Sequence, residues 1–359
     1  MSRASISAWA ALAIGFVSLR SPAKAEFVYV VNGGGGNNVS AYLIDAAGAL
    51  TSIPGSPFAA GNLPSSMVIG GADEFAYVVN ESSNDVSAYR IGTDGALTPV
   101  PGSPFATGDN PHRMAVDPMG KFAYVANAAS NDVSVYRIGP DGGLTPVAGS
   151  PFTAGHFPRS VAVDPTGRFV YVANEVSDDV SVYQIASDGA LTPAPGSPFA
   201  VGIGPFAVVV EPAGKYVYVV NEGENDVSAY RVGDNGALLP VPGSPFATRS
   251  DPHDIAVDPS GRFAYVVNEL SDNLSAYRIL TDGALEPLPG SPFSAGLSPF
   301  SVAVSAKSNF AYVANKFGGN VSAYRIEPEG TLIPFGGSPF AAGAQPCCVV
   351  AGKGGHGGE

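Results

Sequence analysis

The sequence predicts an all-β protein, a seven-bladed β-propeller with four antiparallel strands in each blade. Two repeated phrases carry the prediction. Gly-Ser-Pro-Phe recurs at intervals of 47 residues, beginning at Gly55, Gly102, Gly149, Gly196, Gly243, Gly290 and Gly337. A second phrase, which ends in Tyr-Val-Val-Asn or Tyr-Val-Ala-Asn, closes at Asn32, Asn80, Asn127, Asn174, Asn221, Asn268 and Asn315. Seven copies of a unit of this length are typical of a closed propeller.

Each repeat contains four short β patterns in a fixed order. In the fourth copy they are "SVAVD" at 160–164, "FVYVAN" at 169–174, "DVSVYQI" at 179–185 and the weaker "GALTPAP" at 189–195. The first three alternate between faces and are rich in Val, Tyr and Phe, as strands are. Asp-Pro-Thr-Gly, Ser-Asp-Asp and Asp-Gly signals separate the four runs, and such residues favour turns.

The two ends of the chain predict how the ring closes. Residues 26–32 form a second strand with no first strand ahead of it, and residues 345–352 form a first strand with no second strand behind it. We expect these two strands to pair, because an open sheet edge is a liability. One domain then spans residues 26–352, and the glycine-rich residues 353–359 are expected to form a flexible tail.

The first 25 residues are typical of a secretory signal peptide. Arg3 precedes an apolar run over residues 6–19, and Ala23-Lys24-Ala25 supplies the small residues of a cleavage site. We therefore expect cleavage after Ala25 and a periplasmic or secreted protein. The apolar run is short for a bilayer span, and no later stretch is long and apolar enough, so we expect no membrane span.

Composition excludes several classes of function. The formal net charge is −13, and it becomes −16 once Arg3, Arg20 and Lys24 leave with the signal peptide. An acidic surface repels phosphate backbones, so we expect no nucleic-acid partner. The only cysteines, Cys347 and Cys348, are neighbours and cannot form a disulfide framework. Two free thiols are the favoured interpretation over a vicinal disulfide or a metal site, and we expect a monomer.

The repeats differ from one another at one end of the predicted blade. If the first strand runs down from the top face and the second returns to it, the start of strand one and the end of strand two share the top. The Asp-Pro-x-Gly and Asp-Gly turns then lie at the bottom, where their near-identity reflects turn chemistry. The Asn that ends strand two is present in every repeat, so we expect a structural role for it.

The top positions carry different chemistry in each repeat. The pairs after the proline of strand one are Ser65-Ser66, His112-Arg113, Arg159-Ser160, Phe206-Ala207, His253-Asp254, Phe300-Ser301 and Cys347-Cys348. The residues after the Asn of strand two are Gly33, Glu81, Ala128, Glu175, Glu222, Glu269 and Lys316. Repeat proteins build an asymmetric site on a symmetric scaffold in this way, so the pattern predicts a site at the mouth of the pore.

We predict the centre of this site at three residues, His112, Arg159 and Glu175, because adjacent blades bring these unlike groups together. The residues expected around them are Arg113, Glu222, His253, Asp254 and Glu269. Glu81 is expected to stand apart from the cluster. Solvated side chains that vary without a function are the alternative interpretation.

The Tyr-Val-Val-Asn copies, with Asp-Pro-x-Gly-Arg/Lys-Phe-x-Tyr-Val before them, resemble the YVTN-type surface propellers. More specifically, they resemble the seven-bladed lactonase family that includes bacterial 6-phosphogluconolactonase and fungal carboxymuconate cyclase, over about the whole chain after residue 25. In that family one blade carries Pro-Arg-His at the start of strand one and Asn-Glu at the end of strand two, with a His in the preceding blade. Arg159, Glu175 and His112 match this pattern, and Ser160 stands where the family has histidine.

The resemblance implies hydrolysis of a small sugar or carboxylate lactone. A carboxylate beside a guanidinium would activate water, Arg159 and Arg113 would bind the substrate carboxylate or the developing oxyanion, and His112 would carry the leaving alkoxide's proton. These roles need no cofactor. No Cys/His spacing of the zinc type occurs, although carboxylates at a pore mouth can hold Ca²⁺. The alternative is a propeller without enzymatic activity that binds a protein, a glycan or a component of the cell envelope.

Overall fold

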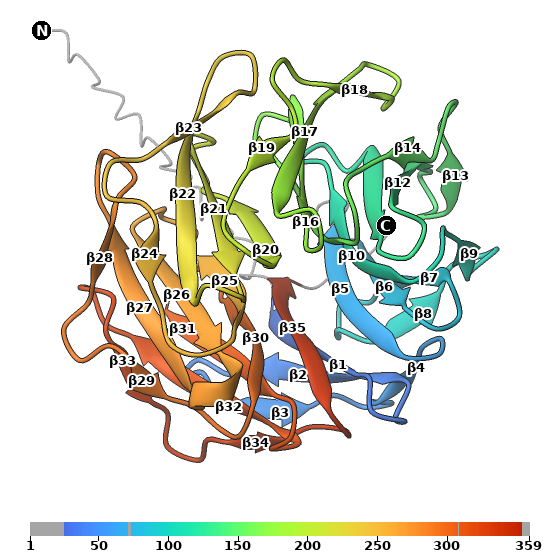
Figure 1. The fold of residues 1–359 in the computed structure, drawn as a ribbon. Coiled ribbons are helices and arrows are strands. Elements are labelled where there is room, and N and C mark those ends of the chain that lie inside the picture. The colour runs from blue at the N-terminus through green and yellow to red at the C-terminus, as the bar shows by residue number, and fades with distance from the viewer. Residues whose placement is uncertain (1–24, 71–72, 308, 354–359) are drawn as a thin grey trace, which may run out of the picture.

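The computed structural model describes residues 25–70, 73–307 and 309–353. In this part of the chain the predicted seven-bladed propeller is confirmed: seven β-sheets surround one central axis (Figure 1). The predicted signal peptide, residues 1–25, lies outside the described residues except for Ala25, and so does the predicted tail except for Lys353. Within the described ranges, none of the helical segments has the length and apolar character needed to cross a bilayer.

Each blade has three full strands, which follow one another outward from the pore, and a divided fourth strand outside them. The innermost strands are β35 (Pro346–Lys353), β5 (Pro64–Gly70), β10 (Pro111–Val116), β15 (Pro158–Val163), β20 (Pro205–Val210), β25 (Pro252–Val257) and β30 (Pro299–Val304). The second strands are β1 (Glu26–Asn32), β6 (Phe75–Asn80), β11 (Phe122–Asn127), β16 (Phe169–Asn174), β21 (Tyr216–Asn221), β26 (Phe263–Asn268) and β31 (Phe310–Asn315). The third strands are β2 (Asn38–Ile44), β7 (Asp85–Ile91), β12 (Asp132–Ile138), β17 (Asp179–Ile185), β22 (Asp226–Val232), β27 (Asn273–Ile279) and β32 (Asn320–Ile326).

The outermost strand of every blade is divided in two. Its first part is β3 (Leu50–Ser52), β8 (Leu97–Pro99), β13 (Leu144–Pro146), β18 (Leu191–Pro193), β23 (Leu238–Pro240), β28 (Leu285–Pro287) or β33 (Leu332–Pro334). Its second part is β4 (Phe58–Ala59), β9 (Phe105–Ala106), β14 (Phe152–Thr153), β19 (Phe199–Ala200), β24 (Phe246–Ala247), β29 (Phe293–Ser294) or β34 (Phe340–Ala341). The Gly-Ser-Pro-Phe repeat lies at the division. In blade three its Ser150 hydroxyl accepts the N–H of Val135, which fills the gap in the ladder.

The ring closes as the sequence predicts. β35 pairs antiparallel with β1 from Glu26–Lys353 to Asn32–Pro346, and the sheet of blade one runs in the order β3-β2-β1-β35. Figure 1 shows the red C-terminal strand beside the blue N-terminal one. β35 therefore covers the edge of β1 that faces the pore, and the two strands share one sheet.

The hydrophobic core is divided into seven clusters, each shared by two adjacent blades. One of them packs Tyr124 of β11 against Val161 of β15. The seven second-strand tyrosines are fully buried, and the hydroxyl of Tyr29 donates to the carbonyl of Gly95 in the next blade at 2.9 Å. Packing between blades therefore fixes the ring as one body on which the top-face residues are held.

The repeated Asn and Asp residues hold the turns of each blade by hydrogen bonds to side chains and to the backbone, and they do not form a site. Asn174, which ends β16, is fully buried and donates to Asp179 at 2.6 Å and to Ser181 at 2.9 Å. At the bottom of the same blade, Asp164 accepts the backbone N–H groups of Arg168 and Phe169. The structural roles predicted for both repeats are confirmed.

Candidate functional site

The variable residues lie at the top mouth of the pore because of how the first two strands pair. In blade three Pro111 pairs with Asn127, so the start of β10 and the end of β11 share the top face. Arg113 pairs with Ala126, which leaves His112 as the extra residue of a β-bulge. The same register shift follows the proline in all seven blades. Bulges re-aim side chains, and here they present the variable positions to the pore.

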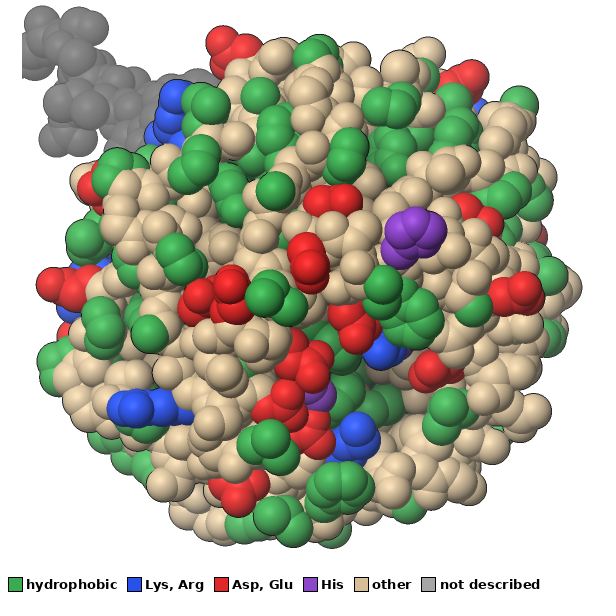
Figure 2. All heavy atoms as spheres, viewed as in Figure 1, with side chains coloured by type: hydrophobic (Ala, Val, Ile, Leu, Met, Phe, Trp, Pro, Cys, Tyr) green, Lys and Arg blue, Asp and Glu red, His purple; other side chains and the backbone are tan. Residues whose placement is uncertain are grey.

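Acidic side chains dominate this face. Figure 2 shows them gathered around its centre, with basic and histidine side chains among them. The charged and titratable residues that the blades place at the mouth are Glu81, His112, Arg113, Arg159, Glu175, Glu222, Asp251, His253, Asp254, Glu269 and Lys316. The excess of acidic side chains gives the whole mouth a negative charge that attracts cations. An anion can therefore be bound only beside a basic side chain.

Arg159 and Glu175 form an ion pair within blade four. Arg159 is the second residue of β15, Glu175 follows β16, and Nε of Arg159 donates a hydrogen bond to Oε2 of Glu175. The two side chains are 21% and 26% exposed, so solvent and ligands can reach them. The guanidinium also lies over the rings of Phe157 and Phe206, 4.7 and 5.2 Å from their centres. One carboxylate and two rings thus fix the position of the cation.

His112 is held against this pair through the backbone. Its Nδ1 lies 3.0 Å from the carbonyl oxygen of Arg159. Because a carbonyl only accepts, the ring proton belongs on Nδ1 and Nε2 keeps its lone pair. Burial lowers the pKa of His112 well below its usual 6.5, and the charges of Arg159 and Arg113 lower this pKa further. The imidazole is therefore neutral at pH 7.

Arg113 forms an ion pair across the pore. Its Nη1 donates to Oδ1 of Asp254 in blade six at 2.8 Å, and the two side chains are 22% and 9% exposed. The second oxygen of Asp254 accepts the N–H of Val302 at 3.1 Å. Each group is thus committed to a partner, and the pair ties blade three to blade six.

The position that follows the bulge joins neighbouring innermost strands. The hydroxyl of Ser160 accepts the N–H of Val208, and that of Ser301 accepts the N–H of Val349, both at 3.2 Å. Ser160 is almost fully buried. The serine at the place where lactonases typically have histidine therefore links β15 to β20 and is not available to a ligand.

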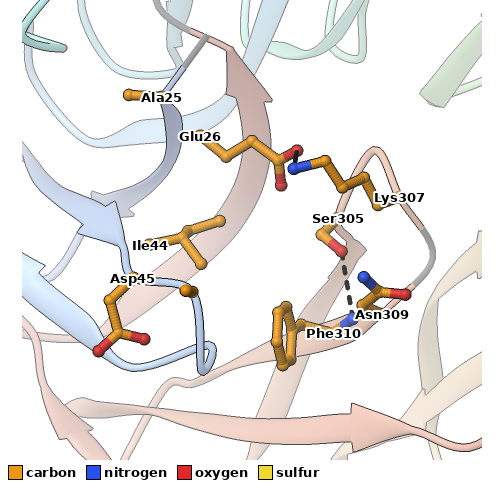
Figure 3. Close-up of a pocket in the computed structure, with 9 residues that line it drawn as sticks. Ala25, Glu26, Ile44, Asp45, Ser305, Lys307, Asn309 and Phe310 are labelled. Atoms are coloured by element: carbon orange, nitrogen blue, oxygen red, sulfur yellow. Dashed lines mark hydrogen bonds and ion pairs between the residues drawn. The ribbon is translucent and has the colours of Figure 1, made fainter. Parts of the chain in front are cut away.

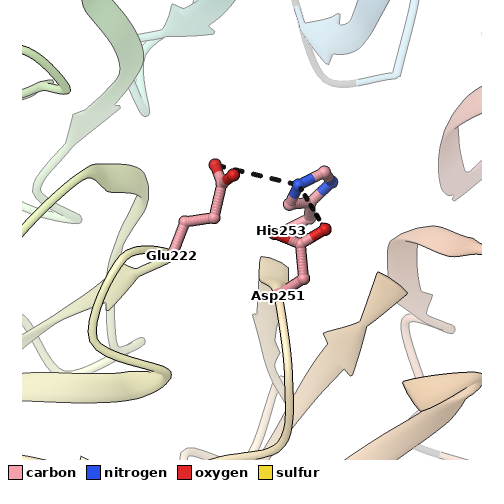
Figure 4. A group of neighbouring side chains, drawn as sticks. All are labelled: Glu222, Asp251 and His253. Atoms are coloured by element: carbon pink, nitrogen blue, oxygen red, sulfur yellow. Dashed lines mark ion pairs between the residues drawn. The ribbon is translucent and has the colours of Figure 1, made fainter. Parts of the chain in front are cut away.

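His253 holds in blade six the position that Arg159 holds in blade four. Its Nδ1 lies 2.9 Å from Oε2 of Glu269, a close contact that falls outside the direction of a hydrogen bond. Its Nε2 lies 3.8 Å from Oε2 of Glu222 and 3.7 Å from Oδ2 of Asp251. Figure 4 shows both carboxylates facing the same ring nitrogen. Three acidic groups from blades five and six thus surround one imidazole.

The environment of these acids moves their pKa values in opposite directions. Burial acts to raise the pKa of Glu269, but contacts with His253 and Ser298 outweigh burial and leave it below the ordinary value. Burial is the largest influence on the pKa of Glu222 and raises it; His253 acts to lower this pKa, and the negative charges of Asp251 and Glu175 act to raise it, so that it lies above the ordinary value. Of Glu222 and Glu269, Glu222 is therefore the acid whose charged form the site disfavours.

Two phenylalanines form an apolar wall between the two clusters. The ring of Phe206 stacks on His253 with centroids 4.5 Å apart and meets His112 edge-on at 5.6 Å. Phe300 meets His253 edge-on at 4.5 Å, and Lys316 lies over the Phe300 ring at 4.2 Å. These aromatic contacts desolvate both imidazoles and fix the planes of their rings.

A cavity of about 260 Å³ opens at the pore mouth beside His112. Its lining includes Glu81, Phe300, Lys316 and Cys347. Ligand pockets of roughly 300–1,000 Å³ are usual, so this one suits a small molecule. Glu81, which lies one blade away from His112, also lines this cavity.

The two cysteines carry free thiols, as the favoured interpretation predicts. Sγ of Cys347 contacts the carbonyl of Pro64 at 3.2 Å. Burial raises the pKa of both thiols, that of Cys348 to about 11 in spite of the opposing charge of Arg113. Both groups therefore stay protonated and unreactive at neutral pH.

A second cavity of about 260 Å³ lies at the bottom of the ring, between blades seven and one (Figure 3). Lys307 pairs with Glu26 at 3.1 Å, and the hydroxyl of Ser305 accepts the N–H of Phe310 at 3.1 Å. This cavity follows the seam where the ring closes and contains none of the variable top residues. We assign no function to it.

The residues just before the proline of strand one were not predicted, yet they complete the site. They are Leu63, Asn110, Phe157, Gly204, Asp251, Ser298 and Gln345, and every one has a positive φ. This left-handed backbone brings Asp251 to His253, Phe157 to Arg159 and Ser298 to Glu269. A signal was present, because this position changes in every repeat as the neighbouring positions do.

The family model described as lactonase, 7-bladed beta-propeller, matches residues 19–204 and 204–346. No curated protein matches the chain.

Solved structures similar to this chain share its fold at low sequence identity. A candidate 6-phosphogluconolactonase from Bacteroides uniformis is 18% identical with a TM-score of 0.81, over 91% of this chain and 99% of that one. A corresponding protein from Bacteroides fragilis is 21% identical with a TM-score of 0.81, over 91% and 98%. The periplasmic gluconolactonase of Pseudomonas aeruginosa is 19% identical with a TM-score of 0.79, over 92% and 99%.

Proposed function

Because the chain belongs to the seven-bladed β-propeller lactonase family, we propose that it hydrolyses a small sugar or carboxylate lactone at the top of the pore. One observation carries the proposal: a solvent-accessible Arg159–Glu175 pair lies against a neutral imidazole, that of His112, at the mouth. The cavity beside His112 has a volume suited to a molecule of this size. The similar Bacteroides and Pseudomonas proteins, named for lactonases, support the same substrate class.

Arg159 stabilises the developing oxyanion. Water adds to the lactone carbonyl carbon, and the carbonyl oxygen gains negative charge in the tetrahedral intermediate. Glu175 accepts from Nε of Arg159, which leaves the terminal nitrogens of the guanidinium to donate to that oxygen. Because the rings of Phe157 and Phe206 already fix the guanidinium, little reorganisation accompanies the reaction.

His112 transfers the proton. Its lowered pKa keeps Nε2 unprotonated at pH 7, where it accepts a proton from the attacking water. The ring C–O bond then breaks, the proton passes to the leaving oxygen, and the product is a hydroxy acid. We assign the base to His112 because the carboxylate of Glu175, first expected to activate water, is bound to the guanidinium of Arg159.

The test is a screen of protein lacking residues 1–25 against small aldonolactones and muconolactones. Arg159→Ala, Glu175→Gln and His112→Asn should each lower kcat/KM on the accepted lactone by about a hundredfold or more. The melting temperature should stay within a few degrees of the wild type. Glu286→Gln is the control, because this exposed acid of β28 pairs only with Arg278 on the outer edge of blade six.

Two results would count against the proposal. The first is a wild-type protein that hydrolyses none of these lactones above the uncatalysed rate. The second is equal activity of Glu175→Gln and the wild type. Either result would favour the alternative, a propeller that binds a protein, a glycan or an envelope component without turnover.

We also propose that the protein is exported, with cleavage after Ala25. Arg3, the apolar run and Ala23-Lys24-Ala25 support the proposal. Trp9 is the single tryptophan, so exported protein should have an intact mass that begins at Glu26 and should lack indole emission. Strong tryptophan fluorescence from exported protein would contradict cleavage.

A further inference from the structure

His253 is a buried imidazole whose Nε2 has no hydrogen-bond partner among the described residues. Its side chain is 8% exposed, and its Nδ1 already lies 2.9 Å from Oε2 of Glu269. The acidic oxygens that face Nε2, on Glu222 and Asp251, lie at 3.8 and 3.7 Å, beyond hydrogen-bond distance. A buried polar group usually has a partner, and its absence within the described residues indicates a ligand that the chain itself does not supply.

The three groups are arranged as metal ligands. One atom from each of Glu222, Asp251 and His253 lies within 4.8 Å of the others (Figure 4). With bonds of about 2.0–2.2 Å, a tetrahedral ion separates its ligand atoms by about 3.4 Å. The contacts of Nε2 at 3.7 and 3.8 Å therefore need to shorten by a few tenths of an ångström, and the oxygens of the two carboxylates, which lie within 4.8 Å of each other, need to close by up to about 1.4 Å; side-chain rotation at the half-buried Glu222 can supply this.

A third carboxylate, that of Glu269, lies on the other side of the histidine. Glu269 is placed with Oε2 2.9 Å from Nδ1, and Oε1 accepts a hydrogen bond from Ser298. Metal-bound histidines nearly always donate their other ring N–H to a carboxylate or carbonyl, which sets the tautomer that leaves the metal-facing nitrogen free. A small turn of the imidazole toward an ion at Nε2 would bring Nδ1 into line with Glu269.

The charge around the site favours a cation. Among the described residues, Glu222, Asp251 and Glu269 have no Lys or Arg partner within 4 Å, and their only ion-pair contacts are to His253. We propose that His253, Glu222 and Asp251 bind a divalent transition metal ion of the Zn²⁺ class, with Glu269 orienting the histidine. The imidazole ligand selects this class, because Ca²⁺ is held by oxygen ligands alone. Three protein ligands leave a further coordination position open at the pore mouth.

Metal binding is measured on protein lacking residues 1–25 by isothermal titration with Zn²⁺, after treatment with a chelator. The wild type should bind one ion per chain, and Zn²⁺ should raise its melting temperature. His253→Phe should weaken binding by about a hundredfold or more, and Glu222→Gln and Asp251→Asn by about tenfold or more. His253→Phe suits the fold, because blades five and seven carry Phe206 and Phe300 at the equivalent position.

Two controls keep the test decisive. Glu81→Gln removes the acid of blade two that corresponds to Glu222, and it should leave Zn²⁺ affinity unchanged because Glu81 accepts a hydrogen bond from Asn110, which stands in blade three where blade six has Asp251. Circular dichroism establishes that each variant is folded. Equal Zn²⁺ affinity of His253→Phe and the wild type, or binding of Ca²⁺ in preference to Zn²⁺, would overturn the proposal. Because no lactone is present, the outcome is independent of the proposed hydrolysis.

Discussion

Blades four and six place a side chain at the start of strand one beside a Glu at the end of strand two, yet the two pairs differ in chemistry. In blade four Nε of Arg159 is bound to Glu175. In blade six His253 contacts Glu269 through Nδ1 and leaves Nε2 directed at Glu222 and Asp251. The same backbone positions thus produce a satisfied ion pair in one blade and an incomplete acidic cluster in the other.

The comparison shows how a repeat protein obtains two unlike sites from one scaffold. A guanidinium is always charged, so Glu175 gains a permanent counterion and blade four presents a net donor to an oxyanion. An imidazole has two ring nitrogens, so blade six directs one of them at Glu269 and the other at the carboxylates of Glu222 and Asp251. Phe206, which stacks on His253 and lies beneath Arg159, separates the two environments.

The bridge that joins the two halves gives the largest expected effect in a stability test. Asp254→Ala would leave the guanidinium of Arg113 unpaired at the centre of the ring. Breaking a buried pair from one side costs 3–5 kcal/mol, and with Arg113 at 22% exposure we expect about 3 kcal/mol. Urea denaturation of the wild type and the variant measures the loss in the free energy of unfolding.

The double variant Arg113→Met with Asp254→Leu sharpens this test. It removes both charges, so it should restore most of the free energy of unfolding that Asp254→Ala loses. Asp234→Ala, in an exposed turn at the bottom of blade five, should change the free energy of unfolding by less than about 0.5 kcal/mol. If Asp254→Ala costs no more than Asp234→Ala, the two halves of the mouth are not held together by this bridge.

The fold could be predicted in detail because every blade meets the same packing demands. Asn174 and its six counterparts satisfy the turn into strand three, and Ser150 and its counterparts fill the break in the outer strand. Each blade has the same requirements, so they appear in the sequence as identical residues at a fixed interval. The division of the outer strand was not visible, since Gly-Ser-Pro-Phe marks a turn without showing that pairing resumes beyond it.

The sequence predicted which positions form the candidate site, but not which side chains pair with one another there. The alternation of strands places His112 and Arg159 on one face, whereas the pairing of Arg113 with Asp254 joins residues 141 apart in the chain. That contact depends on the pore's width and on side-chain rotamers, which periodicity does not encode. Asp251 was missed for a related reason, because its left-handed backbone, φ 62°, directs it to the pore from a segment that reads as a loop.

The smallest expected effect concerns the acid sensitivity of His112 in blade three. His112 has a lowered pKa in the folded protein, because burial and the charges of Arg159 and Arg113 disfavour its protonation. The unfolded chain protonates this histidine below about pH 6.5, whereas the folded chain keeps it neutral. Its contribution to stability is therefore fully present above pH 6.5 and is lost as the pH falls toward the lowered pKa.

His112→Asn removes this proton linkage while its amide can still donate to the carbonyl of Arg159. Between pH 7 and pH 5 the melting temperature of the wild type should fall more steeply than that of His112→Asn. His156→Asn is the matched control, because His156 is exposed on a top loop and its replacement should leave the wild-type slope unchanged. Parallel curves for the wild type and His112→Asn would mean that the pore accepts an imidazolium at this position, and the neutral base assigned to blade three would then be untenable.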